Sequence, residues 1–141
     1  MKEIYHCFNI ETSTDKVYAA LTSKSGLSGW WTRDAEVEGA VGSVSTFRFS
    51  SGAFNKMLIT TAEPEKIEWK CVDGHDEWKE TKITFELRQE GEKTKVCFSH
   101  YGFREQTEYV GECSFHWAYY LMSLQQYCET GTGRPNERAE E

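Results

Sequence analysis

The sequence predicts an α+β domain: a curved antiparallel sheet of six or seven strands around one long C-terminal helix, with two short helices after the first strand. Two observations predict this order. Apolar residues alternate with period two near the N-terminus and through the middle of the chain, which is typical of strands. The period then lengthens to that of a helix over residues 110–128.

The N-terminal segment predicts a strand followed by two short helices. Residues 4–10 alternate over seven positions. Thr12 and Asp15 resemble a capping box, and apolar residues at helical spacing extend a helix to about Ser23. Glycines break that helix, and Trp30 and Trp31 end a second helical turn.

Residues 34–101 read as strands and turns. The alternating segments lie at 46–50, 57–61, 67–72, 82–88 and 95–100, and turn signals separate them. Strands joined in this way predict an antiparallel meander.

The last long element is an amphipathic helix of roughly five turns. Its apolar face is centred on Trp117 and includes Val110, Cys113, Leu121, Leu124 and Cys128. Gly131 and Gly133 end the helix, and Pro135 cannot continue it. We therefore expect one domain over residues 1–133 and a polar tail over 134–141.

Composition disfavours two classes of partner. The formal charge is −7, and lysine and arginine never cluster beyond a local pair. A surface that follows phosphates should be basic, so we expect no binding to nucleic acid and none to an anionic membrane.

The five cysteines are widely spaced, and no two form a C-x-x-C pair. The N-terminus lacks the apolar core of a signal peptide, and no run of 18 apolar residues occurs. We expect a cytoplasmic protein with free thiols. Metal-binding spacings are also missing, so we expect no metal and no cofactor.

The predicted arrangement implies a pocket. A sheet of this size twists and curls, and a straight helix laid across it does not fill the trough. We expect the walls to carry aromatic and aliphatic side chains, among them Trp69, Phe85, Phe98, Trp117, Tyr120, Leu121 and Leu124. The short helices would close one mouth of this space.

Three residues in this region have open roles. His100 shares a strand face with Val96 and Phe98, so it either orients a ligand or acts as a base, or is a hydrogen-bonded core histidine. Trp30 and Trp31 either stack on a ligand as a lid or plug one end of the core. One tryptophan could do each.

A second apolar strip lies on the far side of the last helix. Phe115, Tyr119 and Met122 fall in register there. They either pack on a loop or form a homodimer contact, which Tyr5 and Cys7 could join.

Several motifs occur in an order that resembles a known family. They are Asp15-x-Val17-Tyr18-x-x-Leu21-Thr22, Trp30-Trp31, Glu63-Pro64 before Ile67-x-Trp69, Phe98-x-His100-x-Gly102-Phe103, Trp117-x-x-x-Leu121-x-x-Leu124 and Tyr127-Cys128-Glu129-Thr130-Gly131. Together they resemble the activator-of-Hsp90-ATPase homologue family, within the helix-grip fold of START and Bet v 1-like proteins. The resemblance covers nearly the whole chain.

We rank three functions: the first follows from the predicted pocket, and the resemblance implies the other two. Binding of a small hydrophobic or amphipathic ligand between sheet and helix comes first. A cavity-based enzyme of cyclase or hydrolase type comes second, and would need His100 with a cavity tyrosine or carboxylate. Regulation of an Hsp90-type chaperone ATPase comes third. Fold alone does not choose among them.

Overall fold

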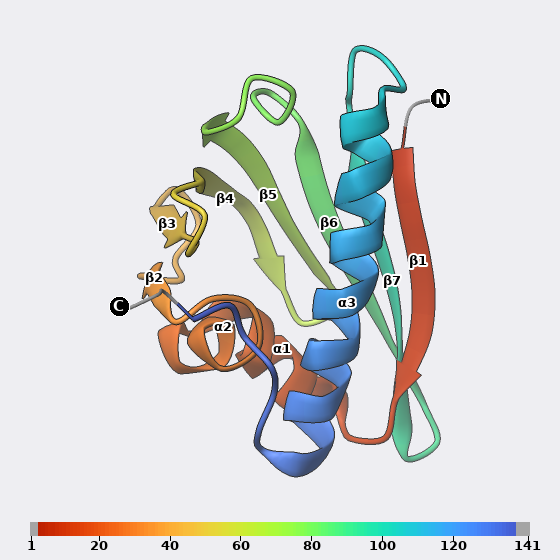
Figure 1. The fold of residues 1–141 in the computed structure, drawn as a ribbon. Coiled ribbons are helices and arrows are strands. Elements are labelled where there is room, and N and C mark those ends of the chain that lie inside the picture. The colour runs from red at the N-terminus through yellow and green to blue at the C-terminus, as the bar shows by residue number, and fades with distance from the viewer. Residues whose placement is uncertain (1–2, 138–141) are drawn as a thin grey trace.

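The computed structural model describes residues 3–137 and confirms the predicted helix-grip fold (Figure 1). In chain order the elements are β1 (Glu3–Ile10), α1 (Thr14–Thr22), α2 (Lys24–Trp30), β2 (Asp34–Glu36), β3 (Val44–Arg48), β4 (Phe54–Glu63), β5 (Lys66–Asp73), β6 (Lys82–Glu90), β7 (Lys93–Tyr101) and α3 (Glu108–Thr130).

All seven strands form one antiparallel sheet in the order β1-β7-β6-β5-β4-β3-β2. Strands β2 to β7 are therefore a meander, and the N-terminal strand closes the other edge by pairing with β7. Figure 1 shows α3 lying along the face of the β6, β7 and β1 side, while α1 and α2 sit at one end of the sheet.

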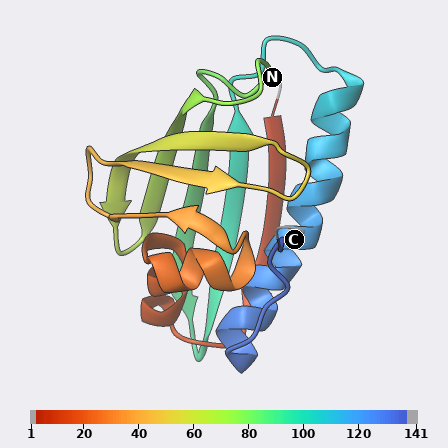
Figure 2. The same ribbon diagram turned by 60° about the vertical axis from the view of Figure 1, so that its left-hand side comes forward.

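The sheet curls sharply at β4. Its pairing with β5 shifts register between Lys56 and Met57 and again between Ile59 and Thr61. Such bulges bend a strand and increase its twist. In Figure 2, β2, β3 and part of β4 accordingly run across the direction of the remaining strands. This bend places the β3–β4 connection opposite α3.

The helix ends are defined by local chemistry. Thr107 caps α3, because its hydroxyl accepts a hydrogen bond from the Val110 N–H at 3.3 Å. Gly131 ends the helix in the left-handed conformation, with φ of 90°. At α1 the capping prediction was wrong: Ser13, not Thr12, precedes the helix, and its side chain makes no capping bond.

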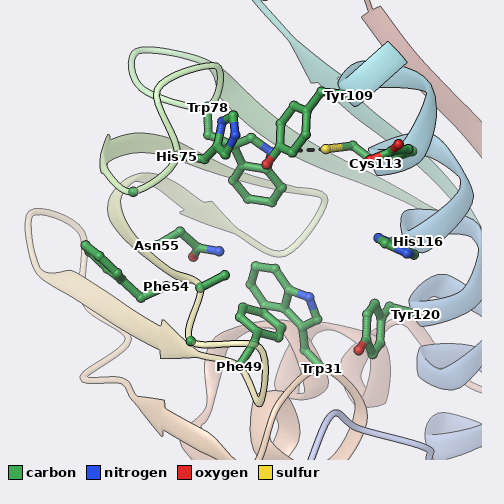
Figure 3. Close-up of a pocket in the computed structure, with 14 residues that line it drawn as sticks. Trp31, Phe49, Phe54, Asn55, His75, Trp78, Tyr109, Cys113, His116 and Tyr120 are labelled. Carbon is green, nitrogen blue, oxygen red and sulfur yellow. Dashed lines mark hydrogen bonds between the residues drawn. The ribbon is translucent and has the colours of Figure 1, made fainter. Parts of the chain in front are cut away.

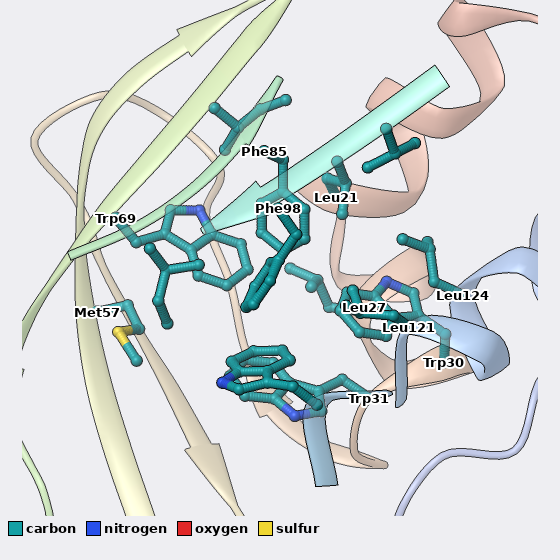
Figure 4. Packing of buried hydrophobic residues seen from close by; sticks show 14 of the residues in the cluster. Leu21, Leu27, Trp30, Trp31, Met57, Trp69, Phe85, Phe98, Leu121 and Leu124 are labelled. Carbon is teal, nitrogen blue, oxygen red and sulfur yellow. The ribbon is translucent and has the colours of Figure 1, made fainter. Parts of the chain in front are cut away.

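The concave face of the sheet and α3 meet in an aromatic core (Figure 4). Trp117 of α3 lies with its ring centroid 4.6 Å from that of Phe98 and 5.2 Å from that of Trp31. Trp69 and Phe85 continue the cluster, with centroids 5.3 Å apart. All five side chains are buried, so large rings rather than empty space fill most of the trough.

The segment after α3 returns to the body of the domain. Asn136 pairs with Thr32 as a short parallel bridge, and its amide oxygen accepts a hydrogen bond from the Ser50 N–H at 2.9 Å. Residues 138–141 of the expected polar tail lie outside the described residues.

The expectation of free thiols was wrong for two of the five cysteines. Cys7 and Cys97 face each other across β1 and β7, with Cα atoms 4.2 Å apart, and form a disulfide. Cys71, Cys113 and Cys128 are free.

Within residues 3–137, no helix combines the length and hydropathy needed to cross a membrane.

Candidate ligand-binding pocket

An open pocket of about 440 Å³ lies between the first half of α3 and the loops that join β3 to β4 and β5 to β6 (Figure 3). Its size is within the range of small-molecule sites. Six aromatic side chains dominate the lining: Trp31, Phe49, Phe54, Trp78, Tyr109 and Tyr120.

One wall is built by the β5–β6 loop against the start of α3. The His75 ring stacks on Tyr109, with centroids 3.8 Å apart and planes only 9° from parallel. Trp78 Nε1 donates a hydrogen bond to Cys113 Sγ at 3.2 Å. These two contacts hold the loop on the helix.

Burial keeps two titratable groups of this wall neutral, the Cys113 thiol and the Tyr109 hydroxyl. It raises the pKa of the Cys113 thiol and that of the Tyr109 hydroxyl, and nearby negative groups such as Glu77 add to both effects. A neutral thiol is a poor nucleophile, so Cys113 has the character of a packing residue.

The opposite wall is centred on Trp31, which is buried from solvent apart from its pocket edge. Its ring contacts Phe47 and Phe49, with centroid distances of 4.5 and 5.6 Å. Figure 3 shows Trp31 and Trp78 on opposite sides of the pocket, with Tyr120 at the α3 edge. The pocket is thus an extension of the aromatic core to the surface.

Asn55 is the polar side chain deepest in the lining. It is 5% exposed, and its Oδ1 has no hydrogen-bond partner in the structure. It occupies an inward position of β4, the face that also carries Met57 and Ile59.

The structure places two of the predicted ligand-binding residues, Trp31 and Tyr120, in the pocket lining. The other eight are not in that lining: Trp30, Trp69, Phe85, Phe98, His100, Trp117, Leu121 and Leu124 are all buried in the core. Rings and aliphatic side chains fill the inner trough, which is why the open space lies further out. Ligand contact by any of them remains a prediction.

The two tryptophans have separate positions. Trp30 is fully buried, and its Nε1 donates a hydrogen bond to the Ala20 carbonyl at 2.9 Å, which fits the role of a core plug. Trp31 reaches the pocket.

His100 is hydrogen-bonded at both ring nitrogens. Trp117 Nε1 donates to Nδ1 at 3.1 Å, so the ring proton lies on Nε2, which donates to Thr81 Oγ1 at 2.9 Å. Burial lowers the pKa of His100 to about 3. The geometry therefore favours a neutral core histidine over a base or ligand contact.

The sequence did not single out several lining residues, among them Phe49, Phe54, Asn55, Trp78 and Tyr109. Phe54, Trp78 and Tyr109 lie in a loop or at the start of an element, where no periodicity marks them. Two signals were present: Phe49 falls in the predicted strand 46–50, and Asn55 alternates with Met57 and Ile59 as a polar residue in a buried row.

A second hollow of about 650 Å³ adjoins the pocket on the outer face of α3. It includes the strip predicted as a homodimer contact: Phe115, Tyr119 and Met122 are 76%, 44% and 58% exposed. The Arg134 guanidinium lies 5.2 Å from the centre of the Tyr119 ring. The rest of the strip faces solvent.

Across the described chain, residues 3–137, no group of three or more His, Cys, Asp and Glu side chains is arranged to hold a metal ion.

Comparison with known proteins identifies the family. Residues 11–129 match the family described as Activator of Hsp90 ATPase homolog 1-like protein. The match spans most of the chain, so the protein belongs to this family, whose START-like fold commonly binds hydrophobic ligands.

Several solved structures have the same fold as this chain. The Aha1 dimer from Colwellia psychrerythraea is 35% identical, with a TM-score of 0.86 over 94% of this chain and 100% of that one. A Staphylococcus saprophyticus protein is 19% identical, with a TM-score of 0.78 over 96% of this chain and 98% of that one. A Mesorhizobium loti protein is 19% identical, with a TM-score of 0.77 over 88% and 94% of the two chains. The last two show the fold alone. No curated protein matches the sequence.

Proposed function

We propose that this protein binds a small hydrophobic or amphipathic molecule in the pocket between α3 and the β3–β4 and β5–β6 loops. The observation that carries the proposal is the pocket itself, an open space of about 440 Å³ bounded by Trp31 on one side and Trp78 on the other. Aromatic side chains that line a concave site favour an apolar ligand.

Three titratable groups near this space, Cys113, Tyr109 and His100, favour binding over catalysis. The pKa of the Cys113 thiol and that of the Tyr109 hydroxyl are both raised by burial, and both ring nitrogens of His100 are occupied. Catalysis and regulation of an Hsp90-type chaperone stay lower-ranked alternatives. An ATPase assay with the host chaperone tests the latter.

The binding proposal is tested with protein purified without detergent. Native mass spectrometry looks for a co-purified ligand, and an NMR titration with 2-naphthol follows the indole N–H signals of Trp31 and Trp78. Trp78→Ala should weaken binding about tenfold or more, because a stacking face is lost. Tyr5→Ala removes an exposed aromatic ring from β1 and should leave binding unchanged. No bound ligand and no titration in the wild type would overturn the proposal.

A second proposal is a homodimer formed through Phe115, Tyr119 and Met122. The exposure of all three side chains in one strip supports it, and so does the description of the Colwellia relative as a dimer. Sedimentation equilibrium should give a dimer for the wild type. Phe115→Glu should give a monomer, whereas Val72→Glu, on an exposed position of β5, should not. A wild-type monomer at high concentration would contradict the proposal.

A further inference from the structure

We propose that the pocket selects hydroxyl-bearing aromatic molecules, and that the Asn55 side chain forms a hydrogen bond with the hydroxyl group. The inference rests on the proposed binding function and names the ligand class. It starts from a polar side chain that is buried without a partner and faces the proposed site.

The position of Asn55 is one where a core residue is expected. Inward side chains on β4 are Asn55, Met57 and Ile59, and Asn55 is paired with the fully buried Phe47 of β3. An apolar residue would suit this row better. Leaving a buried amide oxygen without a hydrogen bond costs about 1–3 kcal/mol. Rotation of the amide would turn this oxygen toward the pocket, where a ligand that pairs with it would recover that cost on binding.

The β5–β6 loop packs closely on the backbone of Asn55. Gly74, at φ 137°, packs directly on it: a Cβ there would lie 2.9 Å from the Phe54 carbonyl oxygen and 3.2 Å from Asn55 Cα. The β5–β6 loop therefore closes over the outer side of Asn55. Figure 3 shows the amide reaching from β4 toward the space between Trp78 and Trp31.

The surroundings of the amide define the rest of the ligand. Trp31 and Trp78 lie on either side, Trp31 with only its edge open to the pocket, and a body of two or three rings fits in about 440 Å³. The described lining includes Glu112 and two histidines but no lysine or arginine, so a carboxylate or phosphate would lack a permanently charged counter-ion. A neutral polar group fits better.

A hydroxyl group matches the amide in both of its orientations. The carbonyl side of an asparagine accepts a hydrogen bond and the NH₂ side donates one, and a hydroxyl can do either. An ether oxygen only accepts, and a methyl group does neither. The predicted preference is therefore for a hydroxyl over a methyl group at the same ring position.

The test compares 2-naphthol with 2-methylnaphthalene, whose methyl group replaces the hydroxyl. Dissociation constants come from the indole N–H signals of Trp31 and Trp78, in the wild type and in Asn55→Leu. The measured quantity is the ratio of the two constants in each protein, because this ratio cancels the different solubilities when the proteins are compared. We expect the preference for 2-naphthol to fall about 5- to 10-fold in Asn55→Leu, as for one lost hydrogen bond.

Asn9→Leu is the matched control. Asn9 also has an amide oxygen without a partner, but it lies on β1 outside the pocket. The ratio of the two dissociation constants in Asn9→Leu should equal that in the wild type. The thermal midpoint of Asn55→Leu should equal or exceed that of the wild type, which separates loss of selectivity from loss of folding.

Equal ratios in the wild type and Asn55→Leu, with both ligands bound, would overturn this inference and leave the binding proposal standing. Absence of binding by both ligands to the wild type would instead overturn the binding proposal, and this inference with it.

Discussion

His100 links the core to the pocket wall through a chain of hydrogen bonds. Trp117 donates to His100, His100 donates to Thr81, and the Thr81 hydroxyl donates to the Trp78 carbonyl. Trp78, the last residue in this series of hydrogen bonds, lines the pocket. A buried histidine therefore helps hold Trp78 in place, without itself reaching the pocket.

The first prediction concerns pH. The pKa of His100 is about 3 in the folded state, against an ordinary value of 6.5, so the unfolded chain binds a proton more readily. Above pH 6.5 the His100 ring is neutral in both the folded and the unfolded state, so its lowered pKa does not affect stability there. Stability falls as the pH drops from 6.5 toward 3, by at most about 1.4 kcal/mol per pH unit from this group.

Urea denaturation from about pH 7.5 to about pH 4.5 measures this loss. The His100→Gln variant has no titrating ring, so its stability should decline less steeply. Carboxylates contribute to both proteins and cancel in the comparison. Parallel declines for the two proteins would show that His100 is not responsible.

The second prediction concerns Gly74. Ala at this position meets both an unfavourable φ and the backbone of Phe54 and Asn55. Gly42 also has positive φ, 94°, but nothing lies within 4 Å of the added Cβ. Gly42→Ala should cost about 1 kcal/mol of unfolding free energy and Gly74→Ala at least about 2 kcal/mol. Equal losses in chemical denaturation would contradict the close packing at Gly74.

At the scale of the element, α3 begins in a cap that also touches the pocket loop. The Thr107 hydroxyl accepts from the Val110 N–H and donates to Glu77 Oε1 at 2.7 Å. Glu77 belongs to the β5–β6 loop that carries His75 and Trp78. The start of the helix and the position of this pocket wall are therefore coupled.

The third prediction compares two N-caps. Thr107→Ala removes a cap bond and the link to Glu77, so it should lower the unfolding free energy by about 1 kcal/mol or somewhat more. Ser13→Ala, at the cap of α1, removes no side-chain bond and should cost less than half as much. Thermal unfolding of the two variants checks this. A larger loss for Ser13→Ala would refute the assignment of the caps.

Element types followed from the sequence because the fold buries one face of each strand and of α3. Periodicity therefore predicted the meander and the long helix, and the glycine at position 131 predicted where that helix ends. Strand β2 has three residues, too few for a period, and was missed. The first residues of β4 alternate, but Asn55 is polar in the buried row, so the predicted strand began only at Met57. Pairing of Cys7 with Cys97 depends on which strands are neighbours, not on local pattern.

At the scale of the whole molecule, the pocket and the exposed strip are adjacent. Both hollows share Phe49, Ala53, His116 and Tyr120. A second copy seated on the strip would lie beside the pocket opening. The sequence predicted that large rings line a cavity, but most of these rings pack against one another inside the trough. Of the predicted ligand-binding residues, only Trp31 and Tyr120 line the open pocket.

The fourth prediction follows from net charge. Each copy carries a formal charge of −7, so two copies repel at long range, while the proposed contact through Phe115, Tyr119 and Met122 is apolar. Salt screens the repulsion and leaves the apolar contact in place. Raising NaCl from about 0.05 M to about 0.5 M should therefore tighten the dimer, about threefold or more in dissociation constant. Sedimentation equilibrium measures it, and a dimer that weakens with salt would point to an ionic interface elsewhere on the molecule.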